Sequence, residues 1–546
     1  MVITDFLERN AKLYAHETAL VEINPSDERD SASTWMEFSL IESAPGGRYR
    51  RELSWFDFDK RANRFANLLL TRGVRKGDKV GILMMNCLEW LPVYFGILKT
   101  GALVVPLNFR YTADEIKYCA DLADLRCLVF GPEFIQRLDG IVGELDKIKD
   151  MFFVGEKKDK PDYADLYDEY VLFCSTQPPA VALDENDNAA IYFSSGTTGR
   201  PKAILHAHKA LVHSCKVEQN HHGQTHDDVF LCIPPLYHTG AKMHWFGSLI
   251  SGSRAVLLRG VKPEWILRAV SEEKATIVWL LVPWAQDLLD ALDSGSIDIS
   301  KLNLSQWRLM HIGAQPVPPS LIKRWFEHFP NHKYDTNYGL SESIGPGCVH
   351  LGVENPHKVG AIGKAGYGWQ IKIIDEKGNP VKQGEVGELA VYGDGVMKCY
   401  YKNPEATQEI LHDGWLSTGD MAREDEDGFI FLVDRKKDVV ISGGENIYPV
   451  EIEDFLRTNI AIKDAAVIGI PDERLGETTA AIIEVKNGCS LTVEELNEFC
   501  KALPRYKRPH KIILADIPRN PTGKIEKPVL RKRYGGDNLI TSQTQR

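Results

Sequence analysis

The chain has 546 residues, which at roughly 100 to 200 residues per domain predicts a few domains and a large buried core. Hydrophobic residues make up 43% and charged residues 26%, which excludes a chain that is disordered throughout. The formal net charge of −11 excludes a global positive field that would hold nucleic acid or an anionic membrane by charge alone.

The apolar stretches and the N-terminus do not predict a membrane or secretory protein. The longest uncharged apolar stretches, 90–98 and 275–285, are shorter than the roughly 20 residues that a bilayer span needs. Charges from Asp5 to Arg9 interrupt the region where a signal peptide would be apolar, and 541–546 carries no retention or prenylation motif. The ten cysteines include no CxxC pair, so we expect free thiols. We therefore expect a cytoplasmic protein without a transmembrane segment.

From about Arg51 onward, amphipathic helical patterns alternate with short apolar runs, which predicts an α/β architecture with largely parallel sheets. Ser54 can cap a first helix, whose apolar residues recur at helical spacing from Phe58 before Gly73 ends it. A helix is predicted at 88–99, and strands at 80–85, 125–130, 188–193, 229–233, 276–281 and 307–312. The polar stretch 24–51 is expected to be an exposed excursion before the first core element.

The composition changes again in the last third of the chain. Glycine-rich sequence from 360 to 428 predicts short β elements, and the charged pentad 434–438 between apolar runs predicts an exposed connection, where we place a domain boundary. Beyond it, helices are predicted at 449–457 and 492–503 and strands at 465–470, 480–485 and 511–514. Residues 501–533 hold six Lys and five Arg against Asp516 and Glu526, a net of +9, which by itself indicates a solvated helix face.

A loop rich in glycine and hydroxyl residues follows the strand predicted at 188–193, and it reads Ser194-Ser195-Gly196-Thr197-Thr198-Gly199-Arg200-Pro201-Lys202. Such a loop after a strand lets backbone N–H groups converge on a phosphate. No GK[ST] closes it, so it is not the Walker pattern. From composition alone, a flexible Ser/Gly turn remains the alternative.

The loop resembles the signature of the adenylate-forming superfamily, which contains acyl-CoA synthetases, aryl-CoA ligases, luciferases and peptide-synthetase adenylation domains. Six further motifs follow in the order of that family. They are 235–240, similar to its aromatic gate; Gly313-Ala314-Gln315-Pro316, similar to its adenine-binding turn; Tyr338-Gly339-Leu340-Ser341-Glu342, similar to its YGxTE motif with Ser for Thr; 415–420, ending at the ribose-binding Asp420; Arg435 and Lys437 with 442–449, similar to its hinge and thioester-step loop; and 520–525 with the mobile Lys524.

The resemblance implies an α/β fold with a large N-terminal domain, 1–434, of layered sheets and a β-barrel-like subdomain. A small mobile α+β C-terminal domain, 435–546, would turn about a hinge near Lys437. It implies an AMP-forming acyl-CoA synthetase, with a role such as fatty acid metabolism. A carboxylic acid and ATP would give an acyl-adenylate and pyrophosphate, and CoA would then take the acyl group. ATP, Mg²⁺ and CoA are the cofactors implied, nucleic acid is not a partner, and a homodimer is compatible with the sequence.

The resemblance also assigns roles to single residues. Lys524 would act in adenylation, Glu342 would bind Mg²⁺ with Ser194 as a weaker ligand, and His238 would be an aromatic plate between acyl pocket and thiol tunnel. The residues implied for the nucleotide are Ser194, Ser195, Gly196, Thr197, Thr198, Gly199, Lys202, Gly313, Ala314, Gln315, Pro316, Asn337, Tyr338, Gly339, Ser341, Asp420 and Arg435. For the thiol half-reaction they are the hinge Lys437, Gly443 and Gly444 beside the pantetheine, and Tyr506, Lys507 and Arg508 at the CoA nucleotide, whereas Leu475 is only aliphatic where some relatives carry a stacking aromatic.

The acyl pocket is expected to be apolar with several small positions, lined by Met243, Trp245, Gly339 and 343–346. This favours an aromatic, alicyclic or medium-to-long-chain aliphatic acid. No acidic residue lies in 238–245 to pair with an ammonium group, which disfavours an amino-acid substrate. We expect Lys242 to point to solvent, with pairing to a second carboxylate as the alternative.

Several readings stay open. A fatty acyl-AMP ligase that loads a carrier protein and a luciferase-type oxygenase would use the same adenylation residues, and the basic stretch 501–533 keeps a nucleic-acid-binding protein as a further alternative. The histidines clustered in the sequence between His206 and His244 have no Cys or carboxylate at ligand spacing and no HExxH motif, so we do not expect them to bind a metal.

Overall fold

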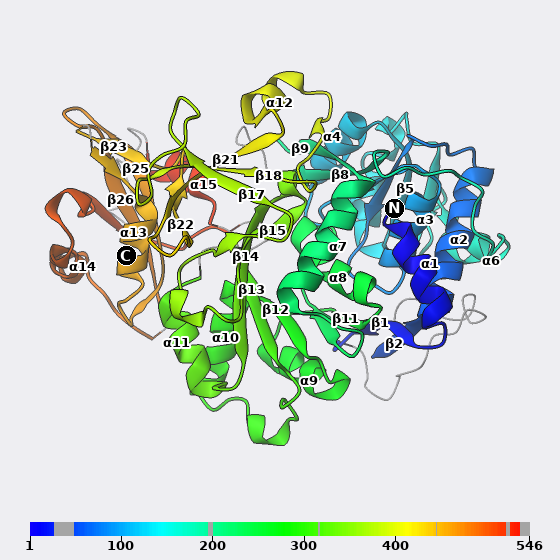
Figure 1. Cartoon of the computed structure of the whole chain (residues 1–546), viewed down its shortest axis with the longest axis horizontal. Helices are drawn as coiled ribbons and strands as arrows, with labels where there is room; N and C mark the ends of the chain where they lie inside the picture. The colour runs from blue at the N-terminus through cyan, green and yellow to red at the C-terminus, as the bar shows by residue number, and fades with distance from the viewer. Residues whose placement is uncertain are drawn as a thin grey trace.

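The structure is a computed structural model and describes residues 1–26, 49–194, 200–314, 317–443, 445–486, 488–519 and 525–535. The strands in these residues form four sheets (Figure 1). Two large sheets belong to the first four hundred residues, a smaller sheet follows them, and the last sheet lies at the C-terminal end of the molecule. The chain is thus a mixed α/β protein.

The first large sheet has nine strands in the order β16-β15-β14-β13-β12-β10-β11-β1-β2. Its pairs from β14 to β1 are parallel, and the two edges are antiparallel. The strands are β1 (Thr18–Ile23), β2 (Arg50–Ser54), β10 (Val229–Cys232), β11 (Arg254–Leu258), β12 (Ile277–Leu281), β13 (Leu309–Gly313), β14 (Lys333–Leu340), β15 (Gly345–Leu351) and β16 (Lys364–Ala365).

The second large sheet has eight strands in the order β19-β9-β8-β4-β3-β5-β6-β7, parallel from β8 to β7. At the other edge, β8, β9 and β19 pair antiparallel. The strands are β3 (Lys79–Leu83), β4 (Leu103–Pro106), β5 (Leu125–Phe130), β6 (Asp150–Phe153), β7 (Asp165–Leu166), β8 (Asn188–Ser194), β9 (Lys202–Ala207) and β19 (Cys399–Tyr400).

Helices between the two large sheets share one core with both. That core joins residues of β3, β4 and β8 to residues of β10, β11 and β12 through α1 (Thr4–Leu13), α2 (Trp55–Thr71), α3 (Trp90–Lys99), α7 (His208–His222) and α8 (Thr239–Ser251). The outer face of the nine-stranded sheet is covered by α9 (Pro263–Glu273), α10 (Val282–Asp293) and α11 (Pro319–His328), and that of the eight-stranded sheet by α4 (Ala113–Ala123) and α5 (Ile135–Asp139). Helix α6 (Tyr167–Leu172) contacts α2.

The remaining two sheets are mostly antiparallel. A curled sheet contains β17 (Gln370–Ile374), β18 (Gly387–Tyr392), β20 (Leu411–His412), β21 (Trp415–Glu424) and β22 (Ile430–Arg435), with α12 (Pro404–Ile410) beside it. The C-terminal sheet contains β23 (Val440–Ser442), β24 (Glu445–Ile447), β25 (Ile462–Asp472), β26 (Gly476–Val485) and β27 (Lys511–Leu514), packed with α13 (Pro449–Leu456), α14 (Val493–Phe499) and α15 (Lys527–Tyr534). The four sheets confirm the predicted fold class.

Most elements lie where the sequence predicts them. Ser54 caps α2 by accepting from Asp57 N, and Gly73 follows the helix with a φ of +79°. Strands β5 and β27 begin and end at the predicted residues, and the other predicted elements agree to within three residues at most ends. The exceptions are β26, which begins four residues earlier than predicted, and α14, which ends at Phe499 before a short 3₁₀ turn.

The start of the chain differs from the prediction. Helix α1 and strand β1 precede the excursion and belong to the core, so the first core element is not at Arg51. Residues 27–48 lie outside the described residues, but Tyr49 and Arg51 are buried and Arg50 is half-buried. Arg51 is only 1% exposed because it forms ion pairs with Glu22 and, at 3.1 Å, with Glu89. Residues 49–51 are therefore not part of an exposed excursion, contrary to the prediction.

The structure bears on two expectations, one about the cysteines and one about membrane-spanning helices. All ten cysteines lie in described residues and all are free thiols. Among the described helices, none combines the length and the apolar character needed to cross a membrane.

Candidate nucleotide and acyl site

One short segment connects the predicted motifs in space. It consists of β14 and the 3₁₀ turn at Ser341–Ser343 that follows it. Strand β14 pairs with β13 in parallel and with β15 antiparallel, so its end lies at the edge of the sheet where β13 also ends. The carboxyl ends of parallel strands are where open α/β sheets bind ligands.

Glu342 lies beside the end of β8. Its Oε1 accepts from the Ser194 hydroxyl at 3.4 Å and from the Tyr400 hydroxyl at 2.8 Å. The Lys202 ammonium lies 4.6 Å from the centre of the Tyr400 ring. The structure thus brings together Ser194, Lys202 and Glu342, to which the resemblance assigns the phosphates and Mg²⁺. Tyr400 was not predicted, because nothing in its local sequence marks strand β19 as a neighbour of β9.

The Glu342 carboxylate and the Ser194 hydroxyl fit Mg²⁺. This ion favours one or two carboxylates together with phosphate oxygens over a cage made only of protein ligands. A carboxylate oxygen with a hydroxyl oxygen 3.4 Å away, at the end of a strand, offers such an incomplete set. Residues 195–199, which would complete the phosphate loop, lie outside the described residues.

Asp420 is held from two sides. Its Oδ2 accepts from the Tyr338 hydroxyl at 2.5 Å, and its Oδ1 lies 3.0 Å from Arg435 Nε. Strands β21 and β22 place Asp420 opposite Arg435 in their register. The Asp420 carboxylate raises the pKa of Arg435, and burial together with Asp420 raises the pKa of the Tyr338 hydroxyl. The three residues predicted for the nucleoside therefore form one group.

Two residues of the predicted nucleotide motifs, Ala314 and Gly339, are constrained by the backbone around them. Ala314 has a φ of +69°, a left-handed conformation that costs a residue with a Cβ on the order of 1–3 kcal/mol. A Cβ at Gly339 would lie 1.9 Å from the Gly345 carbonyl oxygen of β15. Gly339 is thus required by packing between β14 and β15, which is a different reason from the pocket lining that the sequence predicts. Asn337 is buried beside Gly313, and Gln315 and Pro316 lie outside the described residues.

His238 lies at the start of α8. Its Nδ1 accepts from Gly240 N at 3.2 Å, which caps the helix. The neighbouring Thr239 hydroxyl lies 3.3 Å from the Ser341 hydroxyl, and His206 Nε2 lies 2.8 Å from the Ser341 carbonyl oxygen. The predicted aromatic gate therefore adjoins the β14 motif, although Thr239 and His206 were not expected to contact it.

The residues predicted for CoA are placed less completely. Gly443 has a φ of +59° and its N–H donates to the Leu475 carbonyl at 2.9 Å, so a glycine suits this position. Tyr506 is half exposed. Lys507 forms an ion pair with Glu451, while Arg508 donates to the Leu503 and Lys501 carbonyls. Arg435 and Lys437 are exposed at the start of the connection to β23, and Gly444 and Lys524 lie outside the described residues.

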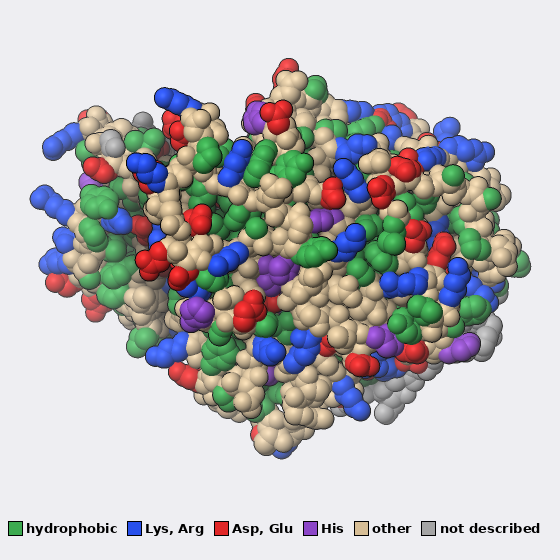
Figure 2. Space-filling view, in the orientation of Figure 1, with side chains coloured by type: hydrophobic (Ala, Val, Ile, Leu, Met, Phe, Trp, Pro, Cys, Tyr) green, Lys and Arg blue, Asp and Glu red, His purple; other side chains and the backbone are tan. Residues whose placement is uncertain are grey.

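Acidic residues outside the basic stretch neutralise much of its charge. Among the described residues of the stretch, five cations form ion pairs: Lys501 with Glu498, Lys507 with Glu451, Arg519 with Asp464, Lys527 with Glu453 and Arg531 with Asp438. On the face in Figure 2, acidic and basic side chains are interspersed. These pairs compensate five of the eleven positive charges of the stretch.

Two residues of α8, one expected in the acyl pocket and one expected at the surface, lie in the core. Trp245 is fully buried in the core between the large sheets, with its ring 6.1 Å from Phe58 and 5.8 Å from Phe95. Lys242 does not point to solvent: it is fully buried, and its ammonium nitrogen lies 3.9 Å from the centre of the Tyr192 ring. In the described part of the chain this nitrogen has no hydrogen-bond partner. Consecutive turns of α8 are buried on all sides, which the sequence pattern did not indicate.

We expect Lys242→Met to stabilise the protein at pH 7, by about 1 kcal/mol or more. Burial lowers the pKa of Lys242 well below its usual value, so between the lowered value and about pH 10 the unfolded chain binds more protons than the folded one. The cost of burying Lys242 therefore grows as the pH falls. Thermal unfolding at pH 7 and pH 9.5 should show a gain that is larger at pH 7. Lys216→Met, at an exposed position of α7, is the control; an equal shift in both variants would contradict the argument.

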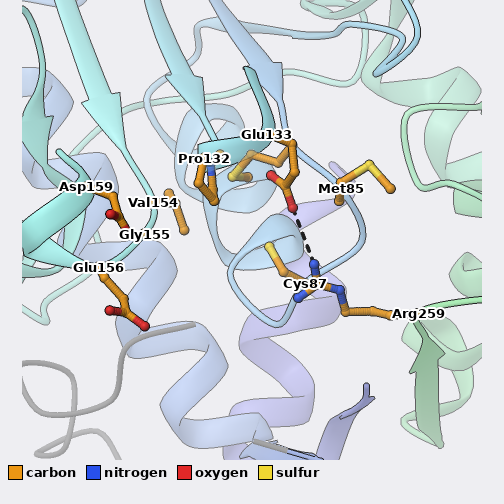
Figure 3. Close-up of a pocket in the computed structure, with 11 residues that line it drawn as sticks. Met85, Cys87, Pro132, Glu133, Val154, Gly155, Glu156, Asp159 and Arg259 are labelled. Atoms are coloured by element: carbon orange, nitrogen blue, oxygen red, sulfur yellow. Dashed lines mark hydrogen bonds and ion pairs between the residues drawn. The ribbon is translucent and has the colours of Figure 1, made fainter. Parts of the chain in front are cut away.

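A separate hollow of about 160 Å³ lies beyond the carboxyl ends of β3, β5 and β6 (Figure 3). Met84, Cys87, Pro132 and Val154 line it, and Glu133 and Arg259 pair across it at 3.3 Å. None of the residues that line it belongs to a predicted motif, so the hollow is not the site described above.

Comparison with known proteins agrees with this geometry. The family model for AMP-binding enzymes matches residues 29–401, more than half of the chain, and the model for the C-terminal domain of AMP-binding enzymes matches residues 451–524. The chain belongs to the family of AMP-binding enzymes. It is a member of the AMP-forming acid–CoA ligases within that family.

Relatives of this AMP-binding enzyme cover nearly its whole length. It is 32% identical over 478 residues to the long-chain-fatty-acid–CoA ligase FadD13 of Mycobacterium tuberculosis, which covers 87% of this chain and 91% of that enzyme. It is 32% identical over 490 residues to the feruloyl-CoA synthase of an Amycolatopsis species, covering 88% and 94%. The crystal structure of the anthranilate CoA ligase AuaEII with anthranoyl-AMP matches with a TM-score of 0.84 and 25% identity over 98% of this chain and 97% of that chain.

Proposed function

We propose that this AMP-binding enzyme joins a carboxylic acid to CoA in two steps. In the first, a carboxylate oxygen of the acid attacks the α-phosphorus of ATP. A new oxygen–phosphorus bond forms, the bond to the β-phosphate oxygen breaks, and pyrophosphate leaves. In the second, the CoA sulfur attacks the acyl carbonyl, the carbon–oxygen bond to AMP breaks, the thiol proton passes to solvent, and the thioester and AMP remain.

The observation that supports the proposal most is the arrangement around β14. One segment places Tyr338 against Asp420 and, four residues later, Glu342 against Ser194. A nucleotide would bind with its ribose at Asp420 and Arg435 and its phosphates at Ser194 and Lys202. The acid would then approach from the side of His238, which adjoins Ser341 through Thr239.

The first step requires positive charge at the phosphates, because one anion attacks another. Lys202 lies at the end of the phosphate loop, and Lys524 would be brought to it by the C-terminal domain. When bound at Glu342, Mg²⁺ would neutralise charge on the phosphate oxygens. Lys524 lies about ninety residues beyond the proposed hinge at Lys437 and belongs to the domain 435–546. Rotation of this domain would therefore bring Lys524 to the phosphates and move it away again.

The same rotation would bring the residues proposed for the second step to the acyl-adenylate. Gly443 and Gly444 would line the pantetheine, where a missing side chain permits close approach. Tyr506 is half exposed and would stack on the CoA adenine, whereas Lys507 and Arg508 would have to leave their internal partners to reach its phosphates. The similarity to a fatty-acid–CoA ligase and a feruloyl-CoA synthase supports CoA as the acceptor over a carrier protein.

The acyl substrate is proposed as a class. Relatives that are about equally similar act, by their names, on long-chain fatty acids and on ferulate. With Trp245 withdrawn into the core, the pocket beside α8 and β15 would be formed by Met243 and by the small residues around Gly345. We propose an aromatic, alicyclic or medium-to-long-chain aliphatic acid.

A panel of such acids, offered with ATP, Mg²⁺ and CoA, tests the proposal directly. We expect AMP and pyrophosphate to appear in equal amounts with the acyl-CoA. Formation of ADP, or no acyl-CoA with any acid, would overturn it. Adenylate that accumulates and is not consumed by CoA would retain the first step and overturn the second.

We expect Asp420→Ala to raise the KM for ATP by roughly 10- to 100-fold, since hydrogen bonds to a charged group contribute about 1.5–3 kcal/mol. Steady-state pyrophosphate release measures this. Tyr338→Phe keeps the carboxylate and removes only the hydroxyl that donates to it, so it should change the KM by less than about tenfold. An unchanged KM in Asp420→Ala, with thermal stability retained, would show that Asp420 does not bind the nucleotide.

A further inference from the structure

Four buried side chains meet on one side of the nine-stranded sheet, outside the residues assigned to ATP and the acid. Neighbouring strands carry three of them: His311 on β13, Asp335 on β14 and His350 on β15. The register explains their proximity, because His311 is the partner of Asp335 and His350 is the partner of Asn337, two residues further along β14 on the same face. His222, the last residue of α7, is the fourth.

The four side chains have the spacing of a metal-ligand set. One ligand atom from each lies within 4.8 Å of the others. His222 Nε2 is 3.2 Å from His311 Nδ1, Asp335 Oδ2 is 3.8 Å from His222 Nε2 and 3.6 Å from His350 Nε2, and His311 Nδ1 contacts Asp335 Oδ1. Four ligands about 2.0–2.1 Å from a tetrahedral zinc ion are about 3.3 Å apart.

Glu218 supplies the second layer that metal-bound histidines usually have. It lies one helical turn before His222, and its Oε2 is 3.4 Å from His222 Nδ1. The same oxygen is 2.6 Å from His244 Nδ1. Within the described part of the chain Glu218 makes no hydrogen bond with His222 Nδ1, but it faces this second ring nitrogen, and a carboxylate in that position orients a histidine that binds a metal.

Several polar atoms of the cluster lack a hydrogen-bond partner. Asp335 Oδ2 and both ring nitrogens of His350 are buried and make no hydrogen bond within the described part of the chain. Glu218 and Asp335 are 1% and 0% exposed, and there their ion pairs are with histidines only. A histidine compensates a buried carboxylate only when it is protonated, whereas a divalent ion would neutralise both carboxylates.

We propose that His222, His311, Asp335 and His350 bind one divalent transition-metal ion of the zinc class, with Glu218 orienting His222. Three imidazoles and one carboxylate suit zinc in a closed structural site. The ion would fix β13, β14 and β15 to each other and to the end of α7. Because Gly313 and Tyr338 follow His311 and Asp335 by two and three residues, the ion would stabilise the strands that form the nucleotide site without contacting the nucleotide.

Metal analysis of the full-length protein, purified without a histidine tag, tests the proposal. We expect about one zinc-class ion per chain, a lower apparent Tm after removal with a chelator, and recovery with Zn²⁺. Co²⁺ added to the stripped protein should give the visible absorption of a tetrahedral site. No ion in the purified protein, together with no uptake of Zn²⁺ or Co²⁺ after stripping, would overturn the proposal.

Variants assign the ion to these residues. His350→Ala and Asp335→Asn should reduce the bound metal to below about a tenth of an ion per chain, and Glu218→Gln should weaken Zn²⁺ binding by about 10- to 100-fold. His213→Ala, which removes another buried histidine of α7 that packs edge-on against Trp369, should keep the metal. Asp335→Asn preserves side-chain volume and tests the assignment even where His350→Ala folds poorly. Full metal content in Asp335→Asn would place the ion elsewhere and overturn the assignment.

Discussion

Lys524→Ala is expected to reduce acyl-adenylate formation by at least about 100-fold, because it removes a cation from the developing charge at the α-phosphate. Transfer of the acyl group to CoA from a supplied acyl-adenylate should stay within about threefold of the unaltered enzyme. The two half-reactions would use opposite faces of the C-terminal domain, so one variant separates them. Pyrophosphate release measures the first, and acyl-CoA formation from synthetic acyl-adenylate measures the second.

Lys532→Ala is the matched control, since Lys532 is an exposed lysine of the same basic stretch. It should leave both half-reactions unchanged. If Lys524→Ala slowed both to the same extent, rotation of the domain about Lys437 would be the wrong explanation for how one chain performs two steps.

Arg51→Met is expected to destabilise the fold by about 3–5 kcal/mol, because removing one partner of a buried ion pair leaves charge uncompensated. Arg51 on β2 pairs with Glu22 on β1 and with Glu89 at the start of α3. Glu22 would keep the hydrogen bond from Leu88 N, at 2.8 Å, and the longer contact with Arg259, at 3.4 Å, while Glu89 would keep a contact with Arg61 at 4.0 Å. The midpoint of unfolding in urea, followed by tryptophan fluorescence, measures the loss.

Arg50→Met provides the comparison on the same strand. Arg50 pairs with Glu52 at 2.8 Å and Glu273 at 2.7 Å, but its side chain is 25% exposed. Solvent screens such pairs, so the loss should be about 1 kcal/mol or less. Equal destabilisation by both variants would show that burial of Arg51 adds nothing to its ion pairs.

The sequence predicts elements well where the pattern is local. The helix capped by Ser54 and the strand at 125–130 follow from periodicity and capping alone, and both are present. Arg51 was misread because a charged residue in a polar stretch resembles a loop. Its burial depends on Glu22 and Glu89, which are distant in the sequence and close only once β1, β2 and α3 have packed.

The candidate site divides in the same way. The motifs around Tyr338, Asp420 and Arg435 are contiguous runs, so their order was sufficient to group them, and the structure joins them. Tyr400 contacts Glu342 only because β19 pairs with β9 across almost two hundred residues. The histidines between His206 and His244 are predicted to lack a carboxylate, although Glu218 lies 3.4 Å and Asp335 lies 3.8 Å from His222 in the structure. Domain rotation and the role of Lys524 stay predictions.

The clamp on Asp420 has a consequence for how a ribose would be received. A carboxylate offers about four lone-pair positions, of which Tyr338 and Arg435 each use one. Two positions are left, which equals the number of vicinal hydroxyls on the sugar. Since the side chain is already immobilised, docking the diol need not freeze a rotamer, and less conformational entropy is lost on association. The Asp420 carboxylate is thus already oriented before a nucleotide would bind.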